Sequence, residues 1–337
     1  MPIDPITYSA VRDHAGLYDA TRAYGRLFAR GKDAIDLLHR MSTNDMKPLE
    51  TGKGLATQTF LTNEKGRIVD LLTVVKDEAG EVMLVTSAGG EEVVIQWMDK
   101  FTIMEDAQFI KATNTISQYE IVGPRASSIV RGFGVDAMDG VDVVGIPIAG
   151  YPSTIWRESD SRYCIFCLTE YASSVWKVLT EEVRSAGGSI IDDELFEVLR
   201  VESGIAKAPN ELNEKHNPLE TSLAASAVSF TKGCYIGQEV IARLDAQGKV
   251  QRQLVGLKFG DGVPKIGDRI SIEGLANVSP LGDEIGEVTS IANSPTKGNI
   301  GLGYVRAKYA NPGQIVSVKD SEGIKLSATL VTLPFDV

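Results

Sequence analysis

The sequence predicts an α+β fold with antiparallel sheets, followed by a small antiparallel β-barrel. In the first part of the chain, short strand-like runs alternate with segments of helical periodicity in β-β-α units. From about residue 250 onward, glycine-punctuated strands without a helical period are typical of a barrel. The chain has 337 residues, of which 43% are hydrophobic, so it is long enough for two or three domains. We expect a domain boundary between residues 1–249 and 250–337.

Two periodicities define the elements of the first part. The expected strands combine apolar alternation with β-branched residues and cover residues 22–29, 55–62, 67–76, 81–87, 117–122, 143–149 and 163–168. The expected helices repeat apolar residues every three or four positions and cover residues 31–41, 125–131, 170–186, 193–200 and a segment that begins near Glu91. The expected barrel strands cover residues 254–259, 269–273, 284–291, 300–305, 315–318 and 326–332.

The charge and the cysteine content exclude several classes of protein. Lys and Arg total 34 against 45 Asp and Glu, which gives a net charge of −11. An extended surface for nucleic acid or for an anionic membrane is therefore not expected, and an anionic ligand would need a local basic pocket. The sequence has no apolar signal region and no apolar run of membrane-spanning length. Three cysteines argue against a disulfide framework and predict a cytoplasmic protein.

Residues 232–239, Lys-Gly-Cys-Tyr-Ile-Gly-Gln-Glu, place a thiol between two glycines. Gly233 and Gly237 permit a tight bend around Cys234. If a helix begins near Gly237, its free N–H groups and its positive dipole end favour a thiolate. The dipole supplies about 0.3–1 kcal/mol, whereas one pKa unit takes about 1.4 kcal/mol, so Lys232 would have to help. The alternative is a buried cysteine that only packs in a glycine turn.

This octapeptide resembles the signature of the YgfZ-type folate-binding proteins, which are relatives of the glycine cleavage T-protein, an aminomethyltransferase. Further matching segments follow in the family's order and span most of the chain: Ser42-Thr43-Asn44-Asp45, residues 61–70, residues 199–204 and residues 217–220. The resemblance implies a folate-binding body of ferredoxin-like modules around a central cavity, followed by the barrel. It also implies tetrahydrofolate, or a one-carbon derivative of it, as the cofactor.

The resemblance further implies a set of site residues. The catalytic candidates are Cys234, Lys232 and Asp70, and the cofactor-binding candidates are Arg200, Asn44, Thr86 and Tyr235. Arg200 begins the Arg-x-Glu-x-Gly motif that lines the folate site in the family, and its planar guanidinium suits a bidentate partner. Without the resemblance, a structural Arg–Glu pair is the alternative. Glu202 faces elsewhere on the helix and is expected to be structural.

Several departures from the aminomethyltransferase pattern bear on the reaction. Those enzymes have a Gly-Gly pair and an Asp-Asp pair, whereas this chain has Arg67 and Leu71 as the second members. A cationic iminium-like species requires a fixed carboxylate beside it, and an alternating strand turns Asp70 and Leu71 to opposite faces. If position 71 faces the cavity, the chain lacks this carboxylate. Residues 156–161 also replace a Gly-Tyr-Thr-Gly-Glu-like segment, and Thr86 stands where the family has an asparagine.

The cysteine pair and the histidines are residue types that occur in metal and redox sites, but their positions here predict neither kind of site. Cys164 and Cys167 form a Cys-x-x-Cys within an apolar strand, so their side chains should point to opposite faces. The three histidines lack ligand spacing with a cysteine, so a zinc site is not expected. His216 is expected to lie at the surface or to anchor its loop.

The resemblance implies one principal function and leaves two alternatives. The principal function is a tetrahydrofolate-binding protein that supports assembly or repair of iron–sulfur clusters, with iron–sulfur client proteins or cluster-assembly factors as partners and Cys234 as the working group. The first alternative is an aminomethyltransferase of the glycine cleavage system that acts with a lipoylated carrier protein. The second is a folate-fold scaffold that uses its barrel only for protein contacts.

Overall fold

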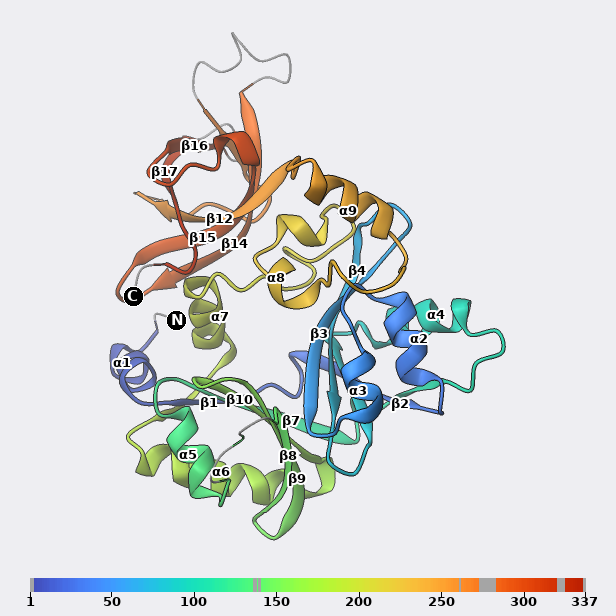
Figure 1. The fold of residues 1–337 in the computed structure, drawn as a ribbon. Coiled ribbons are helices and arrows are strands. Elements are labelled where there is room, and N and C mark those ends of the chain that lie inside the picture. Colours follow the sequence, from blue (N-terminus) through green and yellow to red (C-terminus); the bar gives the residue numbers. More distant parts are fainter. Residues whose placement is uncertain are drawn as a thin grey trace. The chain divides into compact units, whose positions relative to one another are not determined.

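The protein has a mixed α+β fold that ends in a closed antiparallel barrel, as expected (Figure 1). The computed structural model describes residues 3–135, 138, 141–260, 262–272, 283–319 and 325–335. The chain divides into two compact units. Unit 1 comprises residues 1–64, 69–193 and 226–238, and unit 2 comprises residues 65–68, 194–225 and 239–337. Unit 2 contains the barrel together with residues 65–68, 194–225 and 239–249, which precede it. The expected domain boundary between residues 249 and 250 therefore stays a prediction.

A five-stranded sheet forms one half of unit 1. Its strand order is β3-β4-β5-β2-β6, with β3 (Leu55–Thr62), β4 (Ile68–Lys76), β5 (Val82–Ser87), β2 (Tyr24–Arg30) and β6 (Gln108–Lys111). One face is covered by the helices α2 (Ala34–Met41), α3 (Lys47–Thr51) and α4 (Glu91–Phe101) (Figure 1). Leu27, Leu72 and Leu84 on this face are fully buried against Leu38 and Val94 of the helices.

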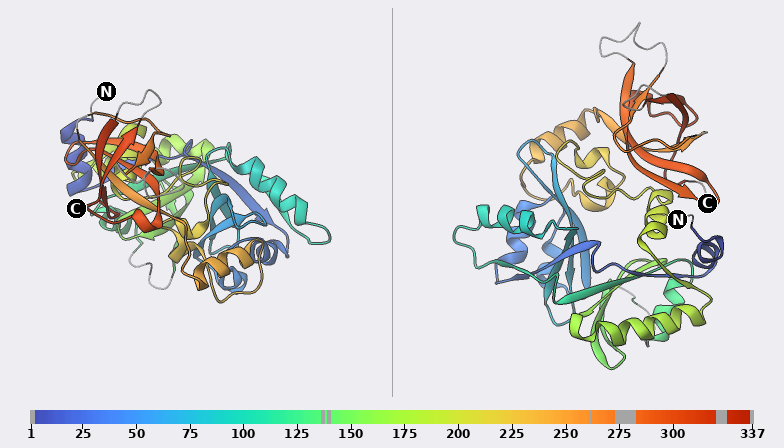
Figure 2. Two further views of the ribbon diagram at one scale, coloured as in Figure 1. Left: turned by 90° about the horizontal axis from the view of Figure 1, so that it is seen from above. Right: turned by 180° about the vertical axis from the view of Figure 1, so that it is seen from behind.

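A six-stranded sheet forms the other half of unit 1. Its strand order is β11-β1-β7-β10-β9-β8, with β11 (Ser189–Ile191), β1 (Gly16–Asp19), β7 (Ile116–Val122), β10 (Arg162–Leu168), β9 (Tyr151–Ser159) and β8 (Val143–Ile148). The strand β11 pairs with β1 in parallel, and the remaining pairs are antiparallel. The helices α5 (Ala126–Gly132) and α6 (Ala172–Ser185) cover one face, as Figure 2 shows from behind.

The faces opposite the helices, which we call the inner faces, pack against each other. Val75, Met83 and Val85 of the five-stranded sheet share one buried cluster with Cys164 and Phe166 of the six-stranded sheet. Because side chains alternate along a strand, every second residue of β4, β5, β7 and β10 lies on an inner face. The face of the strand on which a site residue lies therefore decides whether its side chain contacts the helices or the opposite sheet.

Unit 2 contains the closed barrel and most of α7 (Asp193–Glu202) and α9 (Gln238–Ala246). The strands of the barrel follow the order β12-β15-β14-β13-β16-β17. They are β12 (Arg252–Phe259), β15 (Gly298–Arg306), β14 (Glu284–Ser294), β13 (Arg269–Ser271), β16 (Ile315–Lys319) and β17 (Lys325–Val331). The expected strand 269–273 ends at Ser271, and its last residue, Glu273, lies outside the described residues.

Some elements were not expected from the sequence. They are α1 (Pro5–Asp13), β1, α3, β6, β9, β11, α8 (Ala224–Ala227) and the 3₁₀ helices Pro218–Glu220 and Ala307–Tyr309. The expected helix 170–186 begins with a 3₁₀ turn, Thr169–Tyr171. The sequence does contain a signal for the start of α1. The side chain of Asp4 accepts hydrogen bonds from the N–H groups of Ile6 and Thr7 as an N-cap, and Pro5 occupies the first turn. In the part of the chain that the structure describes, no helix has the length and apolarity needed to cross a membrane.

Candidate functional site

The loop that carries Cys234 forms the predicted bend before a helix. The helix α9 begins at Gln238, and Gly237 has φ +83°, a conformation that favours glycine. Cys234 is exposed, whereas Cys164 and Cys167 are buried. The alternative in which Cys234 is a buried packing residue is therefore wrong.

The ammonium of Lys232 is bound by three backbone carbonyl oxygens. Its Nζ donates to the carbonyl oxygen of His39, to that of Ser42 at 2.6 Å and to that of Asn44 at 2.8 Å. An ammonium has three N–H donors, so all three are used at the C-terminal end of α2, where a cation is favoured. Burial lowers the pKa of Lys232 to about 8. Lys232 therefore fixes the loop on α2, and its help in activating the Cys234 thiol stays a prediction.

Asn44 and Tyr235 lie beside Lys232. The Lys232 ammonium is 5.2 Å from the centre of the Tyr235 ring, and burial raises the pKa of Tyr235 to about 12. The side-chain amide of Asn44 donates to the carbonyl oxygens of Gln58 and Ser226, both at 2.8 Å. Its side-chain oxygen accepts from the N–H of Asp45. Since both amide donors are used within the protein, the cofactor-binding role of Asn44 stays a prediction that requires one of them to be released.

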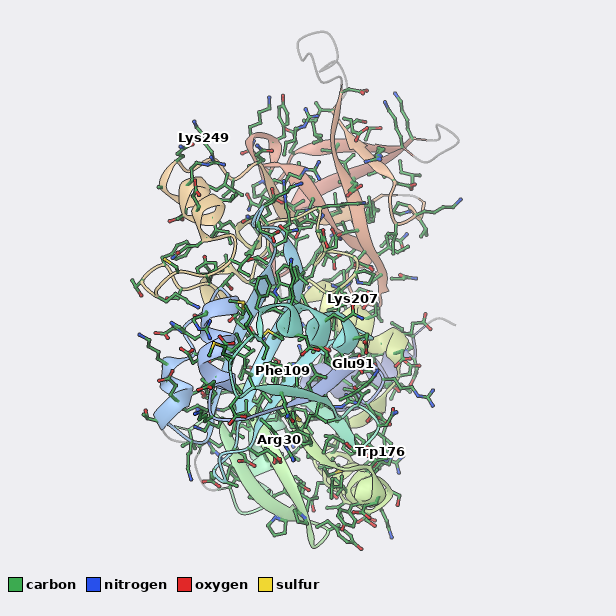
Figure 3. The ribbon with its side chains drawn as sticks, turned by 90° about the vertical axis from the view of Figure 1, so that its right-hand side faces the viewer. Arg30, Glu91, Phe109, Trp176, Lys207 and Lys249 are labelled. Carbon is green, nitrogen blue, oxygen red and sulfur yellow. The ribbon has the colours of Figure 1, made fainter. Side chains whose placement is uncertain are left out.

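Asp70 and Thr86 form a second group, on the helix-covered face of the five-stranded sheet. Asp70 Oδ1 accepts from the N–H of Leu71 at 2.9 Å, and Oδ2 accepts from the N–H of Ser87 at 3.3 Å. Thr86 Oγ1 donates to the carbonyl oxygen of Ser87 at 2.9 Å. Burial raises the pKa of Asp70 to about 6, although hydrogen bonds from Ser87 and Leu71 oppose this effect. The same buried region holds Glu91, which begins α4 (Figure 3).

Leu71 occupies the inner face instead. It alternates with Asp70 and Leu72 and shares its face with Thr73 and Val75, of which Val75 belongs to the inner cluster. The carboxylate of β4 and the inner face are therefore on opposite sides of the strand.

Arg200 belongs to unit 2, whereas the other candidates belong to unit 1, and all donors of its guanidinium are used. Nε and Nη2 donate to the two carboxylate oxygens of Glu197 at 2.9 and 2.7 Å. Nη1 donates to the carbonyl oxygen of Ile205 and to Glu211 Oε2 at 3.3 Å, and Nη2 also donates to Ser290 Oγ at 2.6 Å. These bonds use all five guanidinium donors. The geometry favours the structural Arg–Glu pair, and a folate contact by Arg200 stays a prediction that requires one of these bonds to be exchanged.

A buried polar cluster on the inner faces was missed by the sequence reasoning. Arg162 lies between Glu120, at 2.8 Å, and Glu158, at 3.0 Å, and donates to the hydroxyl of Tyr24 at 3.2 Å. Glu120 pairs with Cys164 in the strand register. Burial raises the pKa of its carboxyl group, although the charge of Arg162 and hydrogen bonds from Arg162 and Tyr24 oppose this effect. The sequence pattern of β7 could have indicated this cluster, because the polar residues Gln118 and Glu120 alternate with Tyr119 and Ile121 in a buried strand.

This polar cluster contains unsatisfied atoms. Among the described residues, Glu120 Oε1, Gln118 Oε1 and Arg26 Nε are buried without a hydrogen-bond partner. Each buried polar atom without a partner lowers the stability of the fold by about 1–3 kcal/mol. Such atoms are rare in native proteins, and a functional role is one reason for them.

The residues that suggested metal or redox chemistry are distributed as expected. Cys164 belongs to the inner cluster and Cys167 to the cluster under α5 and α6, so they face opposite sides. Burial raises the pKa of Cys167 to about 11 and that of Cys164 well above its usual value. No group of three or more metal-binding side chains occurs among the described residues. His216 is fully buried and stacks on Tyr304 at 3.6 Å, so it anchors its loop and is not at the surface.

The protein is similar to named proteins over nearly its whole length. It is 29% identical over 320 residues to "Aminomethyltransferase" of Caldanaerobacter subterraneus subsp. tengcongensis, which covers 92% of this chain and 82% of that protein. It is 28% identical over 341 residues to "Aminomethyltransferase" of Geobacillus kaustophilus, covering 97% and 89%. The crystal structure of glycine cleavage system aminomethyltransferase T from Bartonella henselae matches with a TM-score of 0.80 at 20% identity, over 98% of this chain and 88% of that one. This last similarity shows the fold.

Two family matches together cover most of the sequence. Residues 7–232 match the GCVT N-terminal domain, and residues 252–336 match the glycine cleavage T-protein C-terminal barrel domain. The first match includes the five-stranded and six-stranded sheets, and the second includes the barrel. The chain therefore belongs to the glycine cleavage T-protein family.

Proposed function

We propose that this protein binds tetrahydrofolate and acts in the transfer of a one-carbon unit. T-protein aminomethyltransferases use this cofactor, and the proposal rests on one observation, the unpartnered Oε1 of buried Glu120 on the inner face. The pterin ring of the cofactor presents amino and ring N–H donors, and a buried carboxylate oxygen is a strong acceptor for them. Gln118 Oε1 and Arg26 Nε supply a further acceptor and a donor.

Aminomethyl transfer is the first candidate reaction. It is supported by the relatives of that name, which match the chain almost from end to end. The partner would be a lipoylated carrier protein. A cytoplasmic location, inferred from the few cysteines, is part of the same proposal.

Support of iron–sulfur proteins, as in YgfZ-type proteins, is the second candidate. It is favoured by the exposed thiol of Cys234 and by Leu71 on the inner face, where a transferase would need a carboxylate. The partners would be iron–sulfur client proteins or cluster-assembly factors. Cofactor binding is common to both candidates, so it can be tested separately from the reaction.

Titration calorimetry with tetrahydrofolate tests the binding. We expect Glu120→Gln to weaken binding about tenfold or more, because a hydrogen bond to a charged group contributes about 1.5–3 kcal/mol. Glu181→Gln is the matched control, since Glu181 is exposed on α6 over the other face of the same sheet. No binding by the wild type, or equal binding by the Glu120 variant, refutes the assignment.

A glycine-forming assay with tetrahydrofolate and lipoylated carrier protein then separates the two reactions. Turnover that is unchanged by Cys234→Ser establishes the transferase. Absence of turnover, together with rescue of iron–sulfur enzyme activity that Cys234→Ser abolishes, establishes the second candidate, because a hydroxyl does not replace a thiolate as a soft ligand or nucleophile.

A further inference from the structure

Unit 1 contains a cavity of about 590 Å³ between the inner faces of its two sheets. The floor is apolar and comes from both sheets, with Phe28 and Met83 on one side and Ile116 and Phe166 on the other. Neither the Cys234 loop nor Glu120 lines it. The cavity is therefore separate from the proposed folate contact, although both lie on inner faces.

The rim of this cavity is anionic. Asp77 and Glu81, from the turn between β4 and β5, line it. The turn is held in place because Asp77 Oδ1 accepts from the N–H of Glu81 at 2.8 Å, and Glu78 Oε2 accepts from the N–H of Gly145 in β8 at 3.4 Å. No lysine, arginine or histidine is among the described residues that line the cavity. An anionic ligand is thus disfavoured here.

The chain already places a cation against two of the lining residues. The guanidinium of Arg30, labelled in Figure 3, lies 3.1 Å from Glu81 Oε1 and 5.6 Å from the centre of the Phe28 ring. A carboxylate and an aromatic face are the two groups that bind organic cations. Two carboxylates line the rim and one guanidinium pairs with Glu81, so the rim keeps a net negative charge. Among the described residues, Asp77 forms no ion pair with a cationic side chain within 4 Å.

We propose that this cavity binds a small organic ammonium compound with an aromatic or branched apolar body. The apolar body lies between Phe28, Met83 and Phe166, and the ammonium group lies at Asp77. The volume is within the range of about 300–1,000 Å³ that small-molecule sites occupy, and an apolar lining with a few polar groups is their usual character. Nothing in this proposal depends on folate binding.

Three probes that share a phenylethyl body test the charge preference. Phenethylamine, 2-phenylethanol and 3-phenylpropionate have similar apolar bodies and carry a positive, no and a negative charge. In titrations followed by chemical-shift changes of the full-length protein, we expect phenethylamine to bind at least tenfold more tightly than the alcohol and the carboxylate to bind most weakly. Equal affinities for the amine and the alcohol, or no saturation by the amine at about 10 mM, overturn the proposal.

Two variants test the place of binding. Asp77→Asn keeps the Oδ1 acceptor for the Glu81 N–H but removes the charge, and we expect about a tenfold loss in affinity for phenethylamine. Asp160→Asn is the matched control, because Asp160 is an exposed aspartate in the turn between β9 and β10. Thr154→Trp fills the cavity from β9 and should abolish binding at an unchanged melting temperature. Unaltered affinity in the Asp77 variant contradicts the site, even if the tryptophan variant fails to fold.

Discussion

Replacement of Arg200 by alanine should destabilise unit 2 strongly. The Arg200 side chain is 6% exposed and its guanidinium is hydrogen bonded to Glu211, whose side chain is 0% exposed. Breaking a buried ion pair by removing one partner costs about 3–5 kcal/mol, because the other charge is left uncompensated in a low-dielectric interior. The bonds to Ser290 and Ile205 are lost as well. We therefore expect Arg200→Ala to lower the free energy of unfolding by at least about 3 kcal/mol.

Urea denaturation followed by circular dichroism measures this loss, with tetrahydrofolate titrated in parallel. The double variant Arg200→Met, Glu211→Gln removes both charges and should recover part of the stability, because no buried charge then stays unpaired. Arg200→Lys should lie between the wild type and the alanine variant, since an ammonium has three donors in place of five.

The opposite result would support the role implied by the family motif. If Arg200→Ala changes the free energy of unfolding by less than about 0.5 kcal/mol but weakens tetrahydrofolate binding tenfold or more, the guanidinium serves the ligand and the structural argument is refuted.

Three further outcomes follow from the site. In iodoacetamide labelling of the native protein at pH 8, Cys234 should react first and the two buried cysteines should stay unmodified; labelling of all three at one rate contradicts this. The folded-state pKa of Asp70, about 6, exceeds its unfolded value of 3.8, so its protonated form is favoured in the fold and stability should fall by about 3 kcal/mol as pH rises from about 4 to 6. Asp70→Asn should remove this slope in urea titrations, and a slope that persists assigns it to another group. Lys232→Met removes the ammonium that three carbonyl oxygens accept from and should cost about 3 kcal/mol, whereas the exposed Lys249 (Figure 3) should tolerate the same change.

The elements of the body and barrel were largely predictable because their signals are local. Apolar alternation located β3, β4, β5, β7 and β10, and glycine spacing located most of the barrel strands. Short elements such as β6 and β11 were missed, since three or four residues carry too little periodicity to be distinguished from a loop.

The candidate site was predictable only as far as one strand or one turn reaches. The bend at Gly237, the start of α9 and the opposite faces of Asp70 and Leu71 are properties of adjacent residues, and the structure has all three. The sequence also marked Cys234 as a thiol suited to exposure. It did not indicate the partner of Lys232, because the carbonyl oxygens that accept from its ammonium lie nearly two hundred residues earlier in the chain.

By itself, then, the sequence determined the fold class, the barrel, the family signature and the side of each strand on which a residue lies. Tertiary structure alone decided what each side chain meets there: that Lys232 binds the end of α2, that Arg200 binds Glu211 and Ser290, and that Glu120 is buried beside Arg162 with one oxygen unpaired. The physical reason is that periodicity and turn preference arise from neighbouring residues along the chain, whereas hydrogen-bond partners and burial arise from the packing of segments that are distant in sequence.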